Sequence, residues 1–294
     1  MSATLVIAPP RAWRKPRLLV PALVLAALAV VVITGPAAIG PAGDLVDLRG
    51  RLAPPSFAHW LGTDALGRDL LLRLCLGGRV SLLVGIVAAA AAAGFGTAVG
   101  LVAGYRGGRI DALLMRLTDG VIALPLLPLL VVLAALDPRK LGLGALAQSD
   151  ALSLYRIIVL VALVGWTTVA RLVRGATLSL KAQEFVRAAH AVGAGAVRIM
   201  LVHILPNLAA SIIIATTLSV GEIILLESVL SFLGLGVSPP LASWGSMLTG
   251  AQETVALAPQ LALYPGLLIL VTVVACNFLG EGLRQALDPR AARA

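Results

Sequence analysis

The chain has 294 residues, of which 59% are hydrophobic and only 13% are charged. A soluble domain carries about a quarter of its residues as charged side chains, so this composition excludes an ordinary soluble protein and places the chain in a lipid bilayer. The net charge of +9 does not indicate nucleic-acid binding, because aromatic residues that could stack on bases make up only 4% of the chain. Cys75 and Cys276 lie far apart in no ligand-like spacing and are interpreted as packing residues.

Six apolar segments are long enough to cross the membrane, which takes roughly 20 helical residues for about 30 Å of hydrocarbon. They cover residues 18–39, 80–104, 113–136, 156–174, 208–232 and 261–283. The first follows Arg11, Arg14, Lys15 and Arg17 and has no convincing cleavage site, so it is predicted to be a retained signal-anchor helix. The sequence therefore predicts an all-α membrane protein with six transmembrane helices.

Most of the 23 basic residues fall in alternate connections between these segments. Cytoplasmic connections carry an excess of Lys and Arg, so this asymmetry predicts that both termini are cytoplasmic. The same rule places residues 175–207 in the cytoplasm.

Two features of the first half of the chain predict local packing. Thr63 and Asp64 precede an apolar run and are predicted to cap a short external helix. Gly96, Gly100 and Gly104 repeat every four residues in the second span, a pattern typical of close contact between membrane helices.

A polar, positively charged segment at residues 184–207 separates two long apolar blocks. A short helix is predicted there from Glu184, Phe185, Ala188, Ala189 and Val192. Phe185, Ala189 and Val192 are expected on one face of it. Gly193 and Gly195 predict a C-cap and a sharp turn. A second short helix is expected over 197–205, with Pro206 in the first turn of the fifth span.

Glu222 and Glu227 lie inside the fifth span, where an ionisable group is costly and is a functional candidate by default. Two interpretations remain open for each acid. The favoured one is a hydrogen bond that braces neighbouring helices, and the alternative is a direct role in a pathway through the membrane.

The sequence lacks the motifs of the common enzymes and metal sites. None of the lysines follows a glycine, which excludes a P-loop. H-E-x-x-H and G-x-S-x-G are also absent. The three histidines His59, His190 and His203 stand on different predicted connections, so neither a metal site nor a bound cofactor is predicted.

Residues 184–207 resemble the coupling-helix motif of ABC importer permeases, which reads Glu-Ala-Ala, three residues, Gly, nine residues, Ile-x-Leu-Pro. The matching positions are Ala188, Ala189, Gly193, Leu205 and Pro206. Arg187 replaces the glutamate of the motif and His203 replaces the isoleucine. A histidine in the sequence HILPN is similar to the branch of the family that imports peptides.

Further segments resemble the second permease subunit of dipeptide, oligopeptide and nickel importers over residues 57–290. They are HWLGTDALGRD at 59–69, RVSLLVG at 79–85, AGYRGGRID at 103–111, VGWTTVARLVRG at 164–175, LSFLGLGVSPP at 230–240, WGSML at 244–248 and ALDPR at 286–290.

The resemblance implies a type I ABC importer (MetI-like) permease fold over residues 18–290, with short tails at 1–17 and 291–294 and a cytoplasmic coupling loop at about 175–207. The residues implied in coupling to an ATPase are Glu184, Phe185, Arg187, Ala188, Ala189, Gly193, His203, Leu205 and Pro206. The residues implied in closing the external side are Gly62, Thr63, Asp64, Gly67, Arg68 and Asp69.

The implied function is ATP-driven uptake of peptides or related solutes across the inner membrane. The implied partners are a homologous permease, two cytoplasmic ATPases that use ATP and Mg²⁺, an external solute-binding protein and membrane lipid. Two other classes remain as alternatives, an ion-coupled secondary transporter or channel and a membrane assembly protein. A secondary carrier is expected to show an internal repeat and broken helices.

Overall fold

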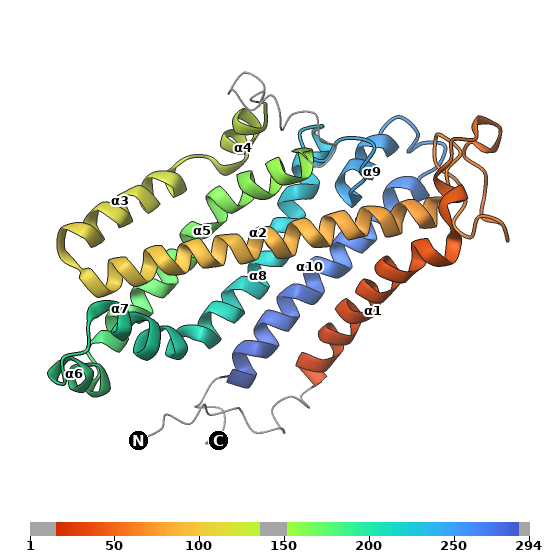
Figure 1. The fold of residues 1–294 in the computed structure, drawn as a ribbon. Helices are drawn as coiled ribbons and strands as arrows, with labels where there is room; N and C mark the ends of the chain where they lie inside the picture. The colour runs from red at the N-terminus through yellow and green to blue at the C-terminus, as the bar shows by residue number, and fades with distance from the viewer. Residues whose placement is uncertain (1–15, 136–151, 288–294) are drawn as a thin grey trace.

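The computed structural model describes residues 16–135 and 152–287. Its long helices are α1 (Pro16–Ile39), α2 (Leu70–Arg106), α5 (Leu152–Lys181), α8 (Leu205–Phe232) and α10 (Gln260–Leu287). They pack lengthwise into one bundle, as Figure 1 shows, and the only strand-like pairing in the described ranges is a bridge between Thr63 and Asp69. Five helices are long and apolar enough to span a membrane, or six if one bent pair forms a single span. The predicted all-α fold is therefore confirmed.

The third predicted span, at 113–136, is a bent pair rather than one straight helix. Helix α3 (Gly108–Ala123) and helix α4 (Leu126–Ala135) meet at an angle of 87°. Pro125 has no backbone N–H, and its ring keeps Leu124 out of the helical region, so Leu124 is extended at φ −77° and ψ 136°. The hydrophobic pattern predicted this segment correctly as apolar but missed the break at the proline.

Helix α2 begins ten residues before the predicted start of the second span. Its 37 residues make a helix about 55 Å long, which exceeds the hydrocarbon thickness. The carboxylate of Asp69 accepts a hydrogen bond from the backbone N–H of Leu72 and so fixes the first turn. The arginines at 73 and 79 that limited the predicted span lie within the helix.

Helices α2 and α5 form the most extensive pair in the bundle. A Cβ atom on Gly96 would overlap the carbonyl oxygen of Trp166, and one on Gly100 would lie 2.6 Å from that of Ala170. Only glycine permits the two backbones to approach so closely. The predicted packing role of the glycine repeat is confirmed.

Short elements lie at the two ends of the bundle. Helices α6 (Glu184–Ala191) and α7 (Ala196–Arg198) lie at one end, and α9 (Trp244–Ala251) lies at the opposite end beside the segment of residues 40–69 (Figure 1). That segment contains two 3₁₀ turns, Pro41–Asp44 and Leu48–Gly50. Residues 1–15 and 288–294, which hold most of the two predicted tails, lie outside the described residues, as do residues 136–151.

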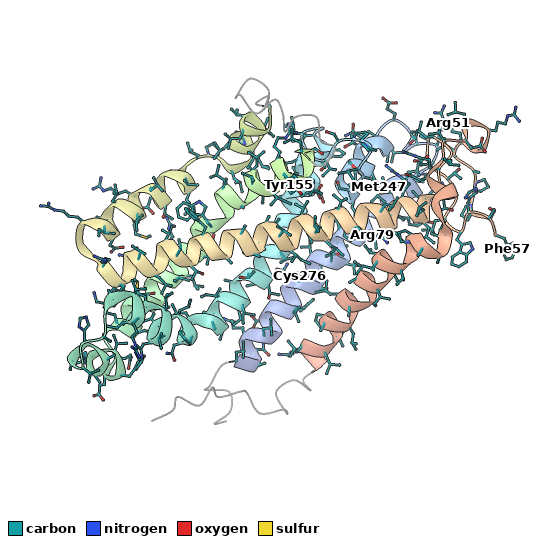
Figure 2. All side chains as sticks on the ribbon, viewed as in Figure 1. Arg51, Phe57, Arg79, Tyr155, Met247 and Cys276 are labelled. Atoms are coloured by element: carbon teal, nitrogen blue, oxygen red, sulfur yellow. The ribbon has the colours of Figure 1, made fainter. Side chains whose placement is uncertain are left out.

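An arginine of α2 satisfies the backbone of α1 where a proline interrupts it. Pro36 lies inside α1 and has no N–H to donate to the carbonyl oxygen of Val32. Arg79 replaces that donor, because its Nε lies 3.0 Å from the Val32 oxygen and its Nη2 donates to the carbonyl oxygen of Ile33. Figure 2 shows Arg79 on α2. A guanidinium and a carbonyl oxygen each cost free energy in an apolar environment when they have no hydrogen-bond partner. The hydrogen bonds between them reduce both costs.

This pairing predicts coupled effects of two substitutions. We expect Arg79→Met to destabilise the protein by about 1–3 kcal/mol, because it leaves carbonyl oxygens of a membrane-spanning helix without their donor. In a Pro36→Ala background the loss is expected to be smaller, since the new alanine supplies the missing backbone N–H. Thermal unfolding of the four proteins in detergent measures the coupling. Equal losses from Arg79→Met in both backgrounds would contradict this role of the arginine.

Candidate functional site

Helix α6 packs onto the end of the bundle through two small apolar residues. Val186 and Ala189 are 2% and 8% exposed. They join a buried cluster formed by Leu101, Tyr105, Val169, Val173, Ile199, Ile204 and Leu208. These residues come from α2, α5, α8 and the turns before α8, and the main direct contacts of α6 are with α5 and with the turns of residues 199–204 that lead into α8.

The three residues predicted to share one face of α6 differ in exposure. Phe185 is 41% exposed and Val192 is 85% exposed, whereas only Ala189 is buried. The helix ends at Ala191, and Val192 is its C-cap with non-helical angles of φ −86° and ψ 12°, so the helical period does not extend to it. The buried pair is Val186 and Ala189, three positions apart. Of the two alanines in the motif, Ala189 faces the chain's own bundle.

The opposite face of α6 is open to solvent in this chain. It carries Glu184, Phe185, Arg187 and Ala188, all of them exposed. The guanidinium of Arg187 turns back along the chain and donates to the carbonyl oxygen of Ala182 at 2.9 Å. One exposed surface of α6 therefore carries a small side chain, Ala188, beside the oppositely charged Glu184 and Arg187.

The turn after α6 has the hydrogen bonds of a Schellman motif. The N–H of Ala194 donates to the Ala189 carbonyl oxygen and the N–H of Gly193 donates to that of His190, each at 3.0 Å. Gly193 has φ +82°, and a Cβ added to it would have no atom within 4 Å. Glycine is therefore required here by backbone conformation alone, and the predicted C-cap is confirmed.

Polar contacts also connect this turn region to α2 and α5. The Tyr105 hydroxyl and His190 Nε2 lie 3.3 Å apart, at hydrogen-bond distance. The ammonium group of Lys181, at the end of α5, donates to the carbonyl oxygen of Tyr105 at 2.5 Å and lies over the Tyr105 ring. Tyr105 thereby links α2, α5 and α6.

The second short helix continues into α8 without a break. Helix α7 leads into a π-helix over Ile199–Ile204, where the Leu205 N–H donates to the Met200 carbonyl oxygen five residues earlier. Pro206 occupies the first turn of α8, as predicted. Leu205 is partly buried, and His203 lines a hollow of about 430 Å³ together with Gly193.

The external segment has a different structure from the predicted capped helix. Thr63 is 2% exposed, and its hydroxyl donates to the Gly50 carbonyl oxygen. The Asp64 carboxylate accepts from the backbone N–H of Leu66 and Arg68 and from the Arg68 guanidinium, which makes a tight turn and no helix. The prediction was wrong because an aspartate can close a turn with the same local hydrogen bonds that cap a helix.

Two glycines hold this external loop tightly against neighbouring backbone. Gly62 and Gly67 have φ of +81° and +77°. A Cβ on Gly62 would lie 2.5 Å from the carbonyl oxygen of Ala53, and one on Gly67 would overlap that of Asp47. Asp69 then accepts from His59 Nδ1 at 2.9 Å while it caps α2. The predicted external residues form one compact loop at the start of α2.

Glu227 is enclosed among hydroxyl groups. Its side chain is fully buried, with Oε1 2.6 Å from the Ser231 hydroxyl and Oε2 3.2 Å from that of Ser81 on α2. Ser81 also accepts from the backbone N–H of Trp244, the first residue of α9. Glu227 thus connects α8 to α2 and, through Ser81, to α9, which is the bracing arrangement.

Glu222, five residues earlier on α8, lies in a different environment. It is exposed, and within the described ranges it has neither a hydrogen bond nor an ion pair. It lines a hollow of about 530 Å³ between the bend of α3 and α4, α5 and α8. The structure does not bring Glu222 and Glu227 together.

The sequence analysis did not single out Ser81, Ser231 or Tyr105. Each falls inside or beside a segment quoted for its resemblance, but a serine or tyrosine near a membrane helix is uninformative without its neighbours. Two signals were available: a buried acid requires hydrogen-bond donors, and Ser231 lies four residues after Glu227 on the same face of the predicted span. Neither signal locates Ser81.

The hydroxyl cage predicts how Glu227 tolerates change. Glu227→Gln is expected to keep most of the stability, because an amide can accept from one hydroxyl and donate to the other. Glu227→Ala is expected to cost about 1–3 kcal/mol, since it leaves the hydroxyls unpaired. Thermal unfolding in detergent measures both, with Glu253→Ala in an exposed turn as the control for lost charge. A Gln variant as unstable as the Ala variant would refute the bracing role.

Comparison with known proteins identifies the family of this chain. Residues 96–293 match the family described as binding-protein-dependent transport system inner membrane component. The chain is 39% identical to the oligopeptide transport system permease protein OppC of Bacillus subtilis, over 81% of this chain and 73% of that protein. It is 41% identical to the dipeptide transport system permease protein DppC of Alkalihalophilus pseudofirmus, over 82% and 75%. It is 40% identical to the glutathione transport system permease protein GsiD of Pectobacterium atrosepticum, over 80% and 74%. The chain therefore belongs to the family of binding-protein-dependent transport system inner membrane components, and it is a multi-pass permease subunit of an ABC uptake system.

Proposed function

We propose that this subunit forms half of the pathway of an ATP-driven importer for peptides. Three similar proteins are named for the transport of oligopeptides, dipeptides and glutathione, which are all peptides. Its partners are a homologous permease, two cytoplasmic ATPases that use ATP and Mg²⁺, and an external solute-binding protein. ATP hydrolysis takes place in the partners, and this chain needs no cofactor of its own.

The observation that carries this proposal is the two-sided packing of α6. One face packs through Val186 and Ala189 into a buried cluster to which α2, α5 and α8 all contribute, and the other face is open. A force applied to the open face therefore reaches three membrane helices at once, because packed interfaces move as units. This is the mechanical requirement for coupling ATPase closure to a change in the bundle.

The residues proposed to dock the ATPases surround the turn at Gly193. Exposed positions on α6 and the hollow lined by Gly193 and His203 give a convex helix beside a concave surface. The end of the bundle that carries α6 also carries the start of α1 and the end of α10 (Figure 1). With the positive-inside rule, we place this end in the cytoplasm.

The external loop is proposed to close the opposite end of the pathway. It is compact, and Asp69 ties it to the first turn of α2. Helix α9 lies at the same end and is linked to α8 through Ser81 and Glu227. Tilting of α2 and α8 would then move both outer elements together, which opens the external side when ATP closes the ATPases.

The proposal is tested at Gly193. A left-handed conformation costs an L-residue about 1–2 kcal/mol, so we expect Gly193→Val to distort the turn without any clash. The variant should reach normal levels in the membrane, lose co-purifying ATPase and show little uptake of peptide.

Two matched glycines serve as controls. Gly195 lines the same hollow but has φ −68° and free space for a side chain, so Gly195→Val adds the same bulk there without straining the turn. It should retain more ATPase and more uptake than Gly193→Val. Gly234 has φ +76° in the same hydrogen-bond pattern at the far end of α8, so Gly234→Val should keep its ATPases. Normal ATPase retention and uptake by Gly193→Val would remove the main support for the coupling role.

A further inference from the structure

Two acids of α8 face in different directions. Glu222 and Glu227 are five residues apart, which separates them by about 140° around the helix. Glu227 points into the hydroxyl cage between helices, whereas Glu222 lines the open hollow of about 530 Å³. In the hollow, the Glu222 carboxylate has neither a hydrogen-bond donor nor a cation from the part of the chain that the structure describes.

The hollow contains no positive charge from the residues that the structure describes. Its polar lining consists of Thr167, Thr168, Ser219 and Glu222, and the remaining lining is apolar. A charged carboxylate facing lipid would be expensive, so membrane acids face a water-filled cavity or a partner of opposite charge. An ionised Glu222 therefore requires water, a cation or both on its open side.

The geometry of the lining suits one class of cation. Ser219 and Glu222 lie three residues apart on α8, so they share a face. A protonated amine has three N–H donors, which a carboxylate and nearby hydroxyl oxygens can accept together. The apolar remainder, which includes Leu127 and Val161, suits the carbon chain attached to such an amine.

We propose that Glu222 forms a cation subsite in the translocation pathway, where it binds the protonated amines of passing solutes. This proposal rests on the proposed function for its substrate, since peptides carry an ammonium group at the N-terminus and on lysine. One carboxylate beside hydroxyls in a wide, open hollow binds an amine weakly, as passage requires. The subsite favours solutes with a positive charge over those with a negative one.

The first test needs no knowledge of the solute. In the assembled complex, with Cys75 and Cys276 replaced by alanine, Ser219→Cys places a thiol one turn from Glu222. Its reaction rates with a trimethylammonium and a sulfonate methanethiosulfonate reagent report the local charge. We expect the cationic reagent to be favoured, and Glu222→Gln to lower that preference about tenfold, which corresponds to about 1.4 kcal/mol.

The matched control is Glu227→Gln, which removes an acid from the same helix on another face and should leave the preference unchanged. An unchanged preference in Glu222→Gln would overturn the subsite. Dissociation of the partner permease from Glu222→Gln would also overturn it, because that result identifies an ion pair between subunits.

The second test uses peptides. Uptake of Ala-Lys-Ala relative to Ala-Glu-Ala into proteoliposomes should fall about tenfold in Glu222→Gln while ATPase activity stays normal. An unchanged ratio would overturn selection of amines by Glu222. A parent complex that transports neither peptide would instead contradict the proposed peptide substrate. The reaction rates of the thiol at position 219 would still test whether Glu222 attracts cations.

Discussion

Helix α6 is packed onto the bundle, because Val186 and Ala189 belong to a buried cluster with side chains of α2, α5 and α8. Tyr105 adds polar contacts to the same junction. At their far ends α2 and α8 connect through Ser81 and Glu227 to the start of α9. A displacement at one end of the bundle therefore has a continuous packed route to the other, and no chemistry within this chain is needed for it.

Three charged side chains within the bundle differ in whether the described residues satisfy them. Arg79 is satisfied by carbonyl oxygens that Pro36 and its turn leave free, and Glu227 is satisfied by serine hydroxyls. Both join neighbouring helices, because Arg79 on α2 binds α1 and Glu227 on α8 binds Ser81 on α2; Ser231 lies on α8 itself. Glu222 alone of these three faces an open hollow without a partner in the described residues. Arg79 and Glu227 therefore stabilise the fold, whereas the Glu222 carboxylate is available to a solute.

The sequence predicted the membrane class, six apolar segments and the motif around Gly193, because composition, segment length and glycine chemistry are local properties. It did not predict the bend at Pro125, since apolarity continues through it. It also placed Val192 on one helical face with Phe185 and Ala189, because the periodic pattern was extended beyond the end of α6. Of the two hydroxyl partners of Glu227, Ser231 lies one turn along the same helix, whereas Ser81 lies on α2 and only the fold brings it to Glu227.

The central claim is that the exposed side of the α6 turn docks an ATPase while the opposite end of the molecule does not. A photo-crosslinking amino acid at Val192, which is 85% exposed, tests this directly in membranes of the assembled complex. The matched position is Phe57, which is fully exposed and projects from the opposite end (Figure 2). Crosslinks to the ATPase from position 192 and none from position 57 are the predicted result. Crosslinks to the ATPase from position 57, or none from position 192, would contradict the account.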